Sequence, residues 1–588
     1  MPHYLPKSVA CLRSGLCREH FVHDLLAGVT VGIIALPLAM AFGIASIPED
    51  VASQSGISPP AMGLYTAVIA GFLISALGGS RVQIGGPTGA FIVIIYGVAS
   101  RHGLEGLMTA TLMAGVIVVI MGLSRFGGMI KFIPYPVTTG FTAGIAVIIF
   151  SSQVKDFFGL QMGQVPADFL EKWQAFAEHA STWKTATFGI GAGSLLMLLL
   201  MRRLVPRIPG AIVVVIVSAT VVSAFHLPVE TIGSKFGGIP HSLPTPRLPT
   251  INLTLIRELI PDATTMAILI AIESLLSAVV ADGMMGGRHK ADCELVAQGI
   301  ANTACALFGG LPATGAIART AANVKSGGRT PIAGMVHALV LLLFMLLAAP
   351  LAAQVPLATL ASVLMVVAWN MSEVGHFRAL LSAPRSDVAV LLTTFGLTVF
   401  ADLTVAVGVG MILASMLFMK RMADVSGVSV VSRELSADEA ELAEFSDPNT
   451  LSIRQVPDGV EVYEINGPFF FGVADRLKDT LNAIERPPAV FILRMRRVPA
   501  IDATGMHALE EFYHKCQRQG TVLLLSGVHA HPLRVFLTTG FDRTIGKANM
   551  FGGIDAALNR AREIMNLPSV SPPTIAVPEV AREMTGGI

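Results

Sequence analysis

Two stretches decide the fold: Gly85-Gly86-Pro87-Thr88-Gly89-Ala90 and Gly309-Gly-Leu-Pro-Ala-Thr-Gly-Ala-Ile-Ala-Arg319. Each places a Gly/Pro break at a short apolar run, residues 87–99 and 313–324, which is too short to cross about 30 Å of hydrocarbon as a helix. Short, interrupted segments at matching positions of two halves are typical of inverted-repeat transporters. The stretches therefore predict two half-helices that begin inside the membrane. A chance coincidence of two loop-like breaks is the alternative.

Twelve further apolar stretches surround these two, so that each half holds seven segments and the broken one is third in its half. Because seven is odd, the second copy must be inverted in the membrane. The fourteen predicted segments are 24–45, 60–78, 87–99, 104–124, 133–151, 185–201, 210–226, 261–281, 294–308, 313–324, 331–349, 355–371, 386–401 and 403–419.

The composition of the 588-residue chain also indicates a membrane protein, because 53% of its residues are hydrophobic and only 14% are charged. A formal net charge of +1 argues against a nucleic-acid-binding protein, which needs a basic surface. The five cysteines form no CxxC pair and suit neither a disulfide framework nor a zinc site. We expect no cofactor and no metal.

Charge density rises after Lys420-Arg421, from about 10% of residues before this point to about 22% after it. The first 23 residues lack the apolar core and cleavage site of a secretory signal, so we expect them to be retained. The resulting prediction is a cytoplasmic N-terminus (1–23), a transport domain (24–422), a linker (423–450), a small α/β domain (451–565) and a flexible tail (566–588).

The distribution of basic residues predicts the orientation. With a cytoplasmic N-terminus, sixteen Lys and Arg fall on the inner side and seven on the outer side, in agreement with the positive-inside rule. Both ends of the chain are then cytoplasmic. In the tail, strand-like runs at 460–465, 490–495 and 521–525 alternate with helical patterns at 474–484, 506–518 and 533–539, which predicts a mainly parallel, buried sheet.

The starts of the two half-helices are the predicted binding site. Unsatisfied N–H groups and about half a positive charge at each helix start favour an anion. Arg319, inside the second half-helix, adds a full charge that can bind a carboxylate or sulfate with two hydrogen bonds. The residues that we expect to face one another are Thr88, Gly89 and Ala90 on one side and Ala316, Ile317 and Ala318 on the other.

Glu273 is the second ionisable residue well inside a predicted span, and Ser277 lies one turn further along that helix. A carboxylate beside an anion repels it unless the carboxylate takes up a proton. Proton and anion binding would then favour each other, and we interpret Glu273 and Ser277 as proton-coupling residues. A buried structural pair between Glu273 and Arg319 is the alternative.

Other residues of the spans are less informative. Pro37 predicts a kink in the first span. The kink either has no further role or places Leu38 and Phe42 along the cavity. Four acids lie at predicted span ends, where we expect solvated caps or loop charges rather than carriers: Asp24, Asp282, Asp387 and Asp402.

The motifs resemble those of the SulP (sulfate permease) anion transporters with a C-terminal STAS domain, over roughly residues 20–550. The matching motifs are Asp24-Leu-Leu-Ala-Gly-Val-Thr-Val-Gly, Gly85-Gly-Pro-Thr, Ala271-Ile-Glu-Ser-Leu-Leu-Ser-Ala-Val-Val-Ala-Asp-Gly, Glu294-Leu-Val-Ala-Gln-Gly, Gly309-Gly-Leu-Pro-Ala-Thr-Gly-Ala-Ile-Ala-Arg and, in the tail, Asp502-Ala-Thr-Gly.

This resemblance implies a uracil-permease-like fold of seven plus seven inverted segments, a core domain moving against a gate domain, a bacterial inner-membrane location and a homodimer. It implies that Leu38, Phe42, Thr88, Gly89, Ala318 and Arg319 line the anion pocket. Sodium-coupled bicarbonate members carry Asp, Thr and a further hydroxyl where this chain has Glu273, Ser277 and Ile317. The loss of a hydroxyl ligand weakens the prediction of sodium coupling, whereas a Glu at position 273 resembles the residue of proton-coupled members.

Within the family, Val366-Val-Ala-Trp-Asn-Met-Ser-Glu looks most like the bacterial C4-dicarboxylate branch. Proton-coupled uptake of succinate, fumarate or aspartate is the first prediction. Proton-coupled sulfate transport, sodium-coupled bicarbonate transport and an uncoupled channel are the alternatives. An enzyme is disfavoured because the tail lacks a P-loop or nucleophile–base pair. By resemblance the STAS domain binds a regulatory protein or a nucleotide, and Thr504 is either a phosphorylation site or a simple helix start.

Overall fold

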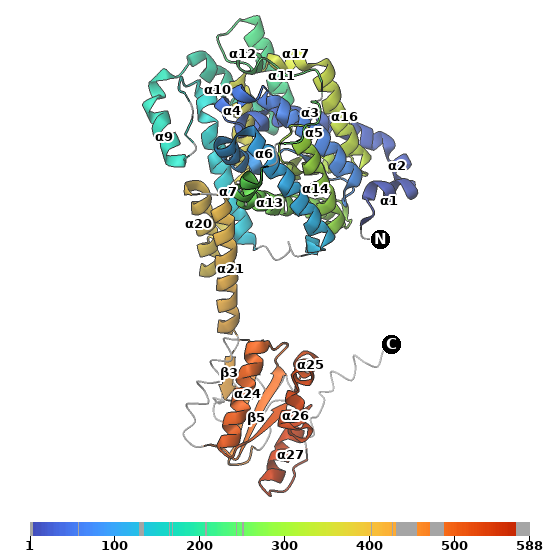
Figure 1. Ribbon diagram of the computed structural model, residues 1–588, viewed down its shortest axis with the longest axis vertical. Coiled ribbons are helices and arrows are strands. Elements are labelled where there is room, and N and C mark those ends of the chain that lie inside the picture. The colour runs from blue at the N-terminus through green and yellow to red at the C-terminus, as the bar shows by residue number, and fades with distance from the viewer. Residues whose placement is uncertain are drawn as a thin grey trace. The chain divides into compact units, whose positions relative to one another are not determined.

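The computed structural model describes residues 4–571, except 57, 129–133, 164, 167, 206–208, 243, 250–251, 402, 426, 431–455 and 471–486. The chain divides into two compact units, Met1–Ala414 and Ser415–Ile588 (Figure 1). The division falls within helix α21 (Leu403–Val425). The domain limits derived from charge density remain predictions.

The first unit is helical. Its helices are α1 (Lys7–Arg13), α2 (Leu16–Glu19), α3 (Phe21–Ser46), α4 (Glu49–Ser55), α5 (Pro59–Leu77), α6 (Ile92–Leu123), α7 (Tyr135–Ser152), α8 (Val154–Phe158), α9 (Phe169–Glu178), α10 (Thr185–Leu204), α11 (Gly210–Ala224), α12 (Ile232–Phe236), α13 (Leu253–Met285), α14 (Ala291–Leu307), α15 (Ile317–Lys325), α16 (Ile332–Leu347), α17 (Ala349–Ala353), α18 (Leu357–Met371), α19 (Val374–Leu380) and α20 (Arg385–Phe400). Two short strands, β1 (Gly85–Gly86) and β2 (Thr314–Gly315), lie among them.

The predicted membrane segments are present as helices. Eight helices of the described chain are long and apolar enough to cross a membrane, and α11 and α16 are shorter apolar helices. Two predicted segments are joined in α6, which is interrupted at Gly103, where φ is 66° and ψ is −169°. The fourteen-segment prediction for a polytopic helical protein is confirmed.

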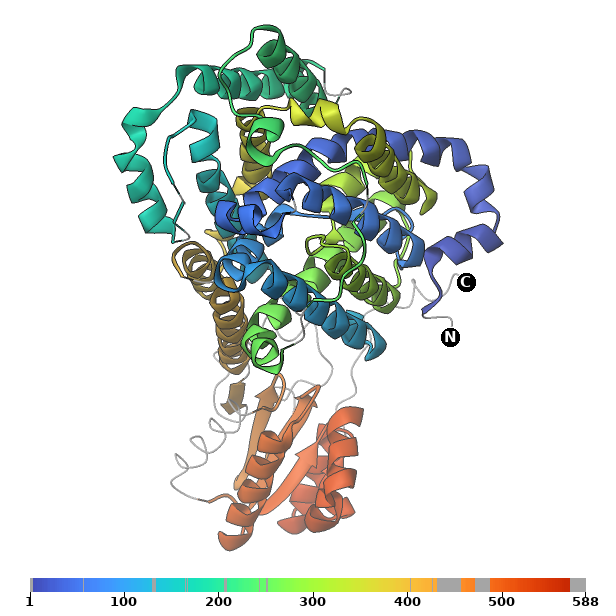
Figure 2. The ribbon, with the colours of Figure 1, turned by 45° about the horizontal axis from the view of Figure 1, so that its top comes forward.

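Helices from the two halves of the sequence are packed against each other (Figures 1 and 2). The first-half helix α3 packs on α16, α5 packs on α14 and α16, and α6 packs on α13 and α14. Glycines and alanines permit these approaches; a Cβ at Gly28 of α3 would lie 2.5 Å from the carbonyl oxygen of Ala333 in α16. The half-helices are therefore held inside a framework built from both repeats.

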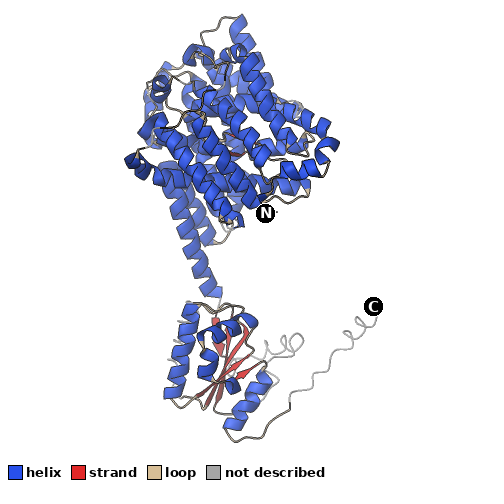
Figure 3. Cartoon of the chain, turned by 45° about the vertical axis from the view of Figure 1, so that its right-hand side comes forward, coloured by secondary structure: helices blue, strands red, loops and turns tan. Residues whose placement is uncertain are grey.

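The second unit is an α/β domain with a five-stranded sheet of order β3-β4-β5-β6-β7 (Figure 3). Only the β3–β4 pair is antiparallel. The elements are β3 (Gly427–Val430), β4 (Val460–Asn466), β5 (Val490–Arg497), α24 (Ala503–Arg518), β6 (Val522–Ser526), α25 (Ala530–Thr539), α26 (Phe541–Ile545), β7 (Met550–Phe551) and α27 (Ile554–Ile564).

Helices cover both faces of this sheet because its strands alternate apolar side chains to either side. Leu493 on β5 packs in the cluster that includes Phe512 of α24, while its neighbour Ile492 packs in the cluster with Leu558 of α27. The mainly parallel sheet was predicted, whereas β3, β7 and α27 were missed. The predicted helix 474–484 lies outside the described residues, as do 572–588 of the predicted tail.

Candidate functional site

The segments that precede the two half-helices lie side by side. β1 and β2 pair antiparallel, with Gly85 opposite Gly315 and Gly86 opposite Thr314. A short 3-10 turn at Gly89–Phe91 leads into α6 after β1, and α15 follows β2 directly. The predicted proximity of the two starts is therefore present in the fold, as a two-residue ladder that we call the crossing.

Side chains from α13 and α15 hold the crossing in place. The Ser274 hydroxyl accepts the N–H of Gly315 at 3.1 Å, and the Thr320 hydroxyl accepts the N–H of Ile84 at 3.1 Å. Thr320 also shares a hydrogen bond of 3.1 Å with Ser277. These contacts satisfy backbone groups that have no water available inside a membrane.

Arg319 joins the two halves. Its guanidinium donates from Nη2 to the carbonyl oxygen of Pro87, on the opposite repeat. The side chain is 3% exposed, and its Nη1 has no hydrogen-bond partner among the described residues. Across the crossing, the Thr88 and Thr314 hydroxyls are 3.3 Å apart. Arg319 thus presents one uncompensated donor, with its positive charge, next to the backbone of both repeats.

The predicted pocket residues differ in accessibility. Phe42 and Gly89 are neighbours, since a Cβ on Gly89 would lie 3.5 Å from Phe42 Cε1. Leu38 is half-buried and packs with the apolar cluster around Val214 and Val363. Of the remaining residues, Ala90 and Ala316 are buried, Thr88 and Ile317 are half-buried, and Ala318 is exposed.

Sequence reasoning missed two residues beside Gly89. A Cβ at this position would lie 2.9 Å from Met371 Sδ and 3.2 Å from Ile149 Cδ1. These side chains come from α18 and α7, far away in the sequence, and no local pattern marks them. Gln83, which donates to the carbonyl oxygen of Ser274 at 3.1 Å, was also missed. As a polar residue two positions before the Gly/Pro break, Gln83 did carry a signal.

Glu273 and Ser277 have different surroundings. Ser277 is fully buried and reaches α15 through Thr320. Glu273 is half-buried and lines a crevice of about 30 Å³, together with apolar residues of α7 and α21. No hydrogen bond or ion pair joins Glu273 to Arg319, both of which are described residues. The alternative of a structural pair is therefore not observed.

The acids at the span ends have structural contacts. Asp24 is fully buried and accepts the N–H groups of Arg329 at 2.7 Å and Thr330 at 3.0 Å, so the expectation of a solvated cap was wrong for this residue. Its buried carboxylate is instead satisfied by backbone donors that precede α16. Asp282 lies 2.7 Å from His289 Nδ1. Asp387 lies in the first turn of α20, and Asp402 lies outside the described residues.

In the second unit, the start of α24 is capped by Asp502, whose carboxylate accepts the N–H of Gly505 at 2.7 Å. Thr504 is exposed in the first turn of this helix. Asp502 therefore caps this helix, and Thr504 is exposed to solvent.

The chain is similar to known proteins along most of its length. The Sulfate permease family matches residues 21–394, and the STAS domain family matches residues 453–557. The "Putative sulfate transporter YvdB" of Bacillus subtilis is 40% identical over 91% of this chain and 96% of its own length. The "Bicarbonate transporter BicA" of a Picosynechococcus species is 30% identical over 83% of this chain and 85% of its own length.

Solved structures show the same fold. The murine Slc26a9 anion transporter in the inward-facing state has a TM-score of 0.82 and 19% identity, covering 95% of this chain and 94% of that chain. The transmembrane domain of BicA has a TM-score of 0.58 and 31% identity, covering 67% of this chain and 97% of that domain. These relatives are transporters, and the expectation that the chain is not an enzyme is confirmed. The chain belongs to the sulfate permease (SulP) family of multi-pass membrane anion transporters and carries a C-terminal STAS domain.

Proposed function

We propose that the protein is a secondary transporter that binds a small divalent anion at the crossing and carries it by alternating access. The observation that supports this most directly is the pairing of β1 with β2 beside the unpartnered Nη1 of Arg319. Each helix start contributes about half a positive charge, so the two starts and Arg319 together offer about two positive charges. This balance favours a dianion over the monoanion bicarbonate.

Two kinds of substrate are candidates, sulfate and the C4-dicarboxylates. The name of the relative from Bacillus subtilis supports sulfate. The resemblance of the segment at Val366 to the dicarboxylate branch supports succinate, fumarate or aspartate, which remains a prediction. Sodium-coupled bicarbonate transport is less well supported, because Ile317 stands where bicarbonate members supply a hydroxyl.

Proton coupling through Glu273 is the finer part of the proposal. The carboxylate lines a crevice that is apolar apart from three threonines, and it has no cationic partner among the described residues. Burying an unpaired charge is costly, and protonation removes this cost. Ser277, on the same helix, contacts Thr320 of α15, so α13 bears both the proposed proton acceptor and a contact to the anion site. Movement of α13 would then link the two.

The assembly and the location belong to the same proposal. We propose a homodimer in a bacterial inner membrane, with both chain ends cytoplasmic and a STAS domain that binds a regulatory protein or a nucleotide. Cross-linking in native membranes tests the dimer, and protease accessibility of the STAS domain in sealed vesicles tests the orientation.

The central experiment is transport by purified protein in liposomes with an acidic outside. Uptake of labelled sulfate, succinate and bicarbonate is compared for the wild type and Arg319→Lys, with the exposed Arg288→Lys as a matched control. We expect saturable, gradient-driven uptake of a divalent anion. We expect Arg319→Lys to raise the half-saturation concentration about tenfold, because it loses one charge-assisted hydrogen bond. Flux that does not saturate would indicate a channel, and an unchanged half-saturation would remove Arg319 from the site.

A further inference from the structure

The first unit contains a second cavity, of about 760 Å³, that is separate from the residues proposed to bind the anion. None of the predicted pocket residues lines this cavity. Its wall includes Ala41, which directly precedes Phe42 in the sequence, and Ile92, which lies three residues after Gly89. Its other wall residues extend to α4, α8 and α9, on the side that the basic-residue distribution assigns to the outside. The cavity therefore leads from that side towards the crossing.

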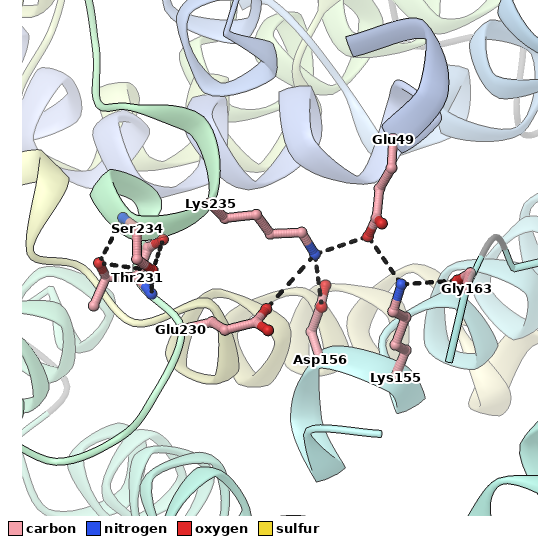
Figure 4. Close-up of polar contacts among 8 residues, drawn as sticks. All are labelled: Glu49, Lys155, Asp156, Gly163, Glu230, Thr231, Ser234 and Lys235. Atoms are coloured by element: carbon pink, nitrogen blue, oxygen red, sulfur yellow. Dashed lines mark hydrogen bonds and ion pairs between the residues drawn. The ribbon is translucent and has the colours of Figure 1, made fainter. Parts of the chain in front are cut away.

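Most charged groups around this cavity are paired with each other. Arg101 lies 2.9 Å from Asp262. Figure 4 shows Lys155 and Lys235, from α8 and α12, directed at Glu49 of α4, with N–O distances of 2.9 Å and 2.8 Å. Lys235 also lies 3.7 Å from Asp156 and 3.9 Å from Glu230. These cations are neutralised by carboxylates of the protein itself.

Lys172 of α9 is the exception. It lines the cavity and is 6% exposed, yet no hydrogen bond or ion pair joins its side chain to any other described residue. The nearby Asp168 is engaged elsewhere, because its Oδ1 accepts the N–H groups of Leu170 at 2.9 Å and Glu171 at 3.2 Å as the helix cap. Burial lowers the pKa of Lys172, and Asp168 opposes this only in part. Asp168 acts on Lys172 as a nearby charge but forms no ion pair with it, so a bound anion would supply the direct partner that the ammonium group lacks.

The position of Lys172 is fixed by its helix. The indole N–H of Trp173 donates to the Ser151 hydroxyl of α7 at 3.1 Å, and the ring of Phe169 contacts that of Phe400 at 5.6 Å between centroids. Phe176, one turn after Lys172, is 4% exposed. Helix α9 is thus anchored against α7 and α20, which fixes the backbone that carries Lys172, so that only the lysine side chain has to be ordered when it binds a ligand.

We propose that Lys172 binds a small oxyanion in this cavity and forms an outer station on the route to the crossing. The inference rests on the proposed transport function and adds a second site to it. Five carboxylates line the cavity among the described residues. Glu49, Asp156 and Asp262 are paired with cations, Asp168 caps α9, and Asp50 lies in the first turn of α4, where the helix dipole favours it. Among the described residues that line the cavity, Lys172 is the cation left free to bind a solute.

An exchange assay in oriented membrane vesicles tests this proposal. The half-saturation concentration of labelled sulfate or succinate, whichever the wild type carries, is measured separately on each side, with the same anion saturating on the opposite side. Right-side-out and inside-out vesicles give the two values. The variants are Lys172→Met, which keeps the length of the apolar stem, and Lys172→Gln. Lys184→Gln, in the segment between α9 and α10, is the matched control.

We expect both Lys172 variants to raise the outer half-saturation concentration about tenfold, equivalent to about 1.4 kcal/mol, and to leave the inner value unchanged. An unchanged outer value, or an equal rise on both sides, would overturn the outer station. Exchange by the wild type in the same vesicles keeps the two proposals apart. If the wild type exchanges no anion, the transport function fails; if it does and the variants behave like it, only the role of Lys172 fails.

Discussion

The crossing has no room for a side chain at Gly86, and Gly86→Ala is therefore the sharpest test of how the site is built. Gly86 has a φ of 149°, which disfavours any residue with a Cβ. A Cβ placed there would lie 2.7 Å from Nη1, 3.2 Å from Nη2 and 3.3 Å from Cζ of Arg319. The methyl group would push the guanidinium away from the carbonyl oxygen of Pro87.

The expected cost has two parts. Backbone strain at an unfavourable φ contributes about 1–3 kcal/mol. Loss of the charge-assisted hydrogen bond to Pro87 contributes about 1.5–3 kcal/mol. Because proteins are stable by only about 5–15 kcal/mol, the sum of roughly 2.5–6 kcal/mol is a large fraction of the total.

Thermal unfolding of the solubilised protein, with and without sulfate, measures both consequences. We expect Gly86→Ala to lower the unfolding temperature and to abolish the stabilisation by anion. Gly97→Ala in α6 is the matched control, because a Cβ there meets nothing within 4 Å. This change should leave anion stabilisation intact. If Gly86→Ala retained the wild-type response to anion, the placement of Arg319 at the crossing would be refuted.

Three further predictions concern other contacts. Glu273→Gln should abolish the stimulation of uptake by an acidic outside, whereas Glu258→Gln, exposed on the same helix, should retain it in the same liposome assay; equal stimulation in both would reject Glu273 as the coupling residue. Ser277→Ala removes a hydrogen bond to Thr320 worth about 1 kcal/mol, so the anion half-saturation should rise about fivefold, and no change would separate α13 from the site. Burial raises the pKa of Glu49, but its two lysine partners outweigh burial and hold this pKa below the ordinary 4.5. The stabilisation is therefore present above pH 4.5 and lost as the pH falls through the depressed pKa. Glu49→Gln should unfold at a lower temperature than the wild type at pH 7, and the difference should shrink in acid; a difference independent of pH would contradict this assignment.

The sequence was sufficient for the membrane architecture because hydrocarbon imposes strong constraints on length and polarity. A span must be apolar and about 20 residues long, so the Gly/Pro breaks at Gly85 and Gly309 stand out as exceptions. The same physics predicted that the two half-helices meet. In the second unit, buried parallel strands could be recognised from apolar runs such as the one around Ile492.

The lateral contacts could not be predicted in the same way. A helix such as α13, apolar on most sides, has no polar face that fixes its rotation, so the crevice around Glu273 and its separation from Arg319 had no sequence signal. Met371 reaches Gly89 only through the packing of α18 against α7. Asp24 was expected to be solvated because no local pattern marks its partners. The backbone N–H groups that bind its carboxylate come from a loop about 300 residues away in the sequence.

The ladder between β1 and β2 has a mechanical consequence. Its strands, one from each repeat, share backbone hydrogen bonds and are further linked by Arg319. Separating them would leave polar backbone groups in hydrocarbon without hydrogen-bond partners, and nothing there can replace the lost partners. The two repeats should therefore move together as one rigid body at this point. A solute must be admitted and released by surfaces that slide past this rigid body, and not by separation of the two strands.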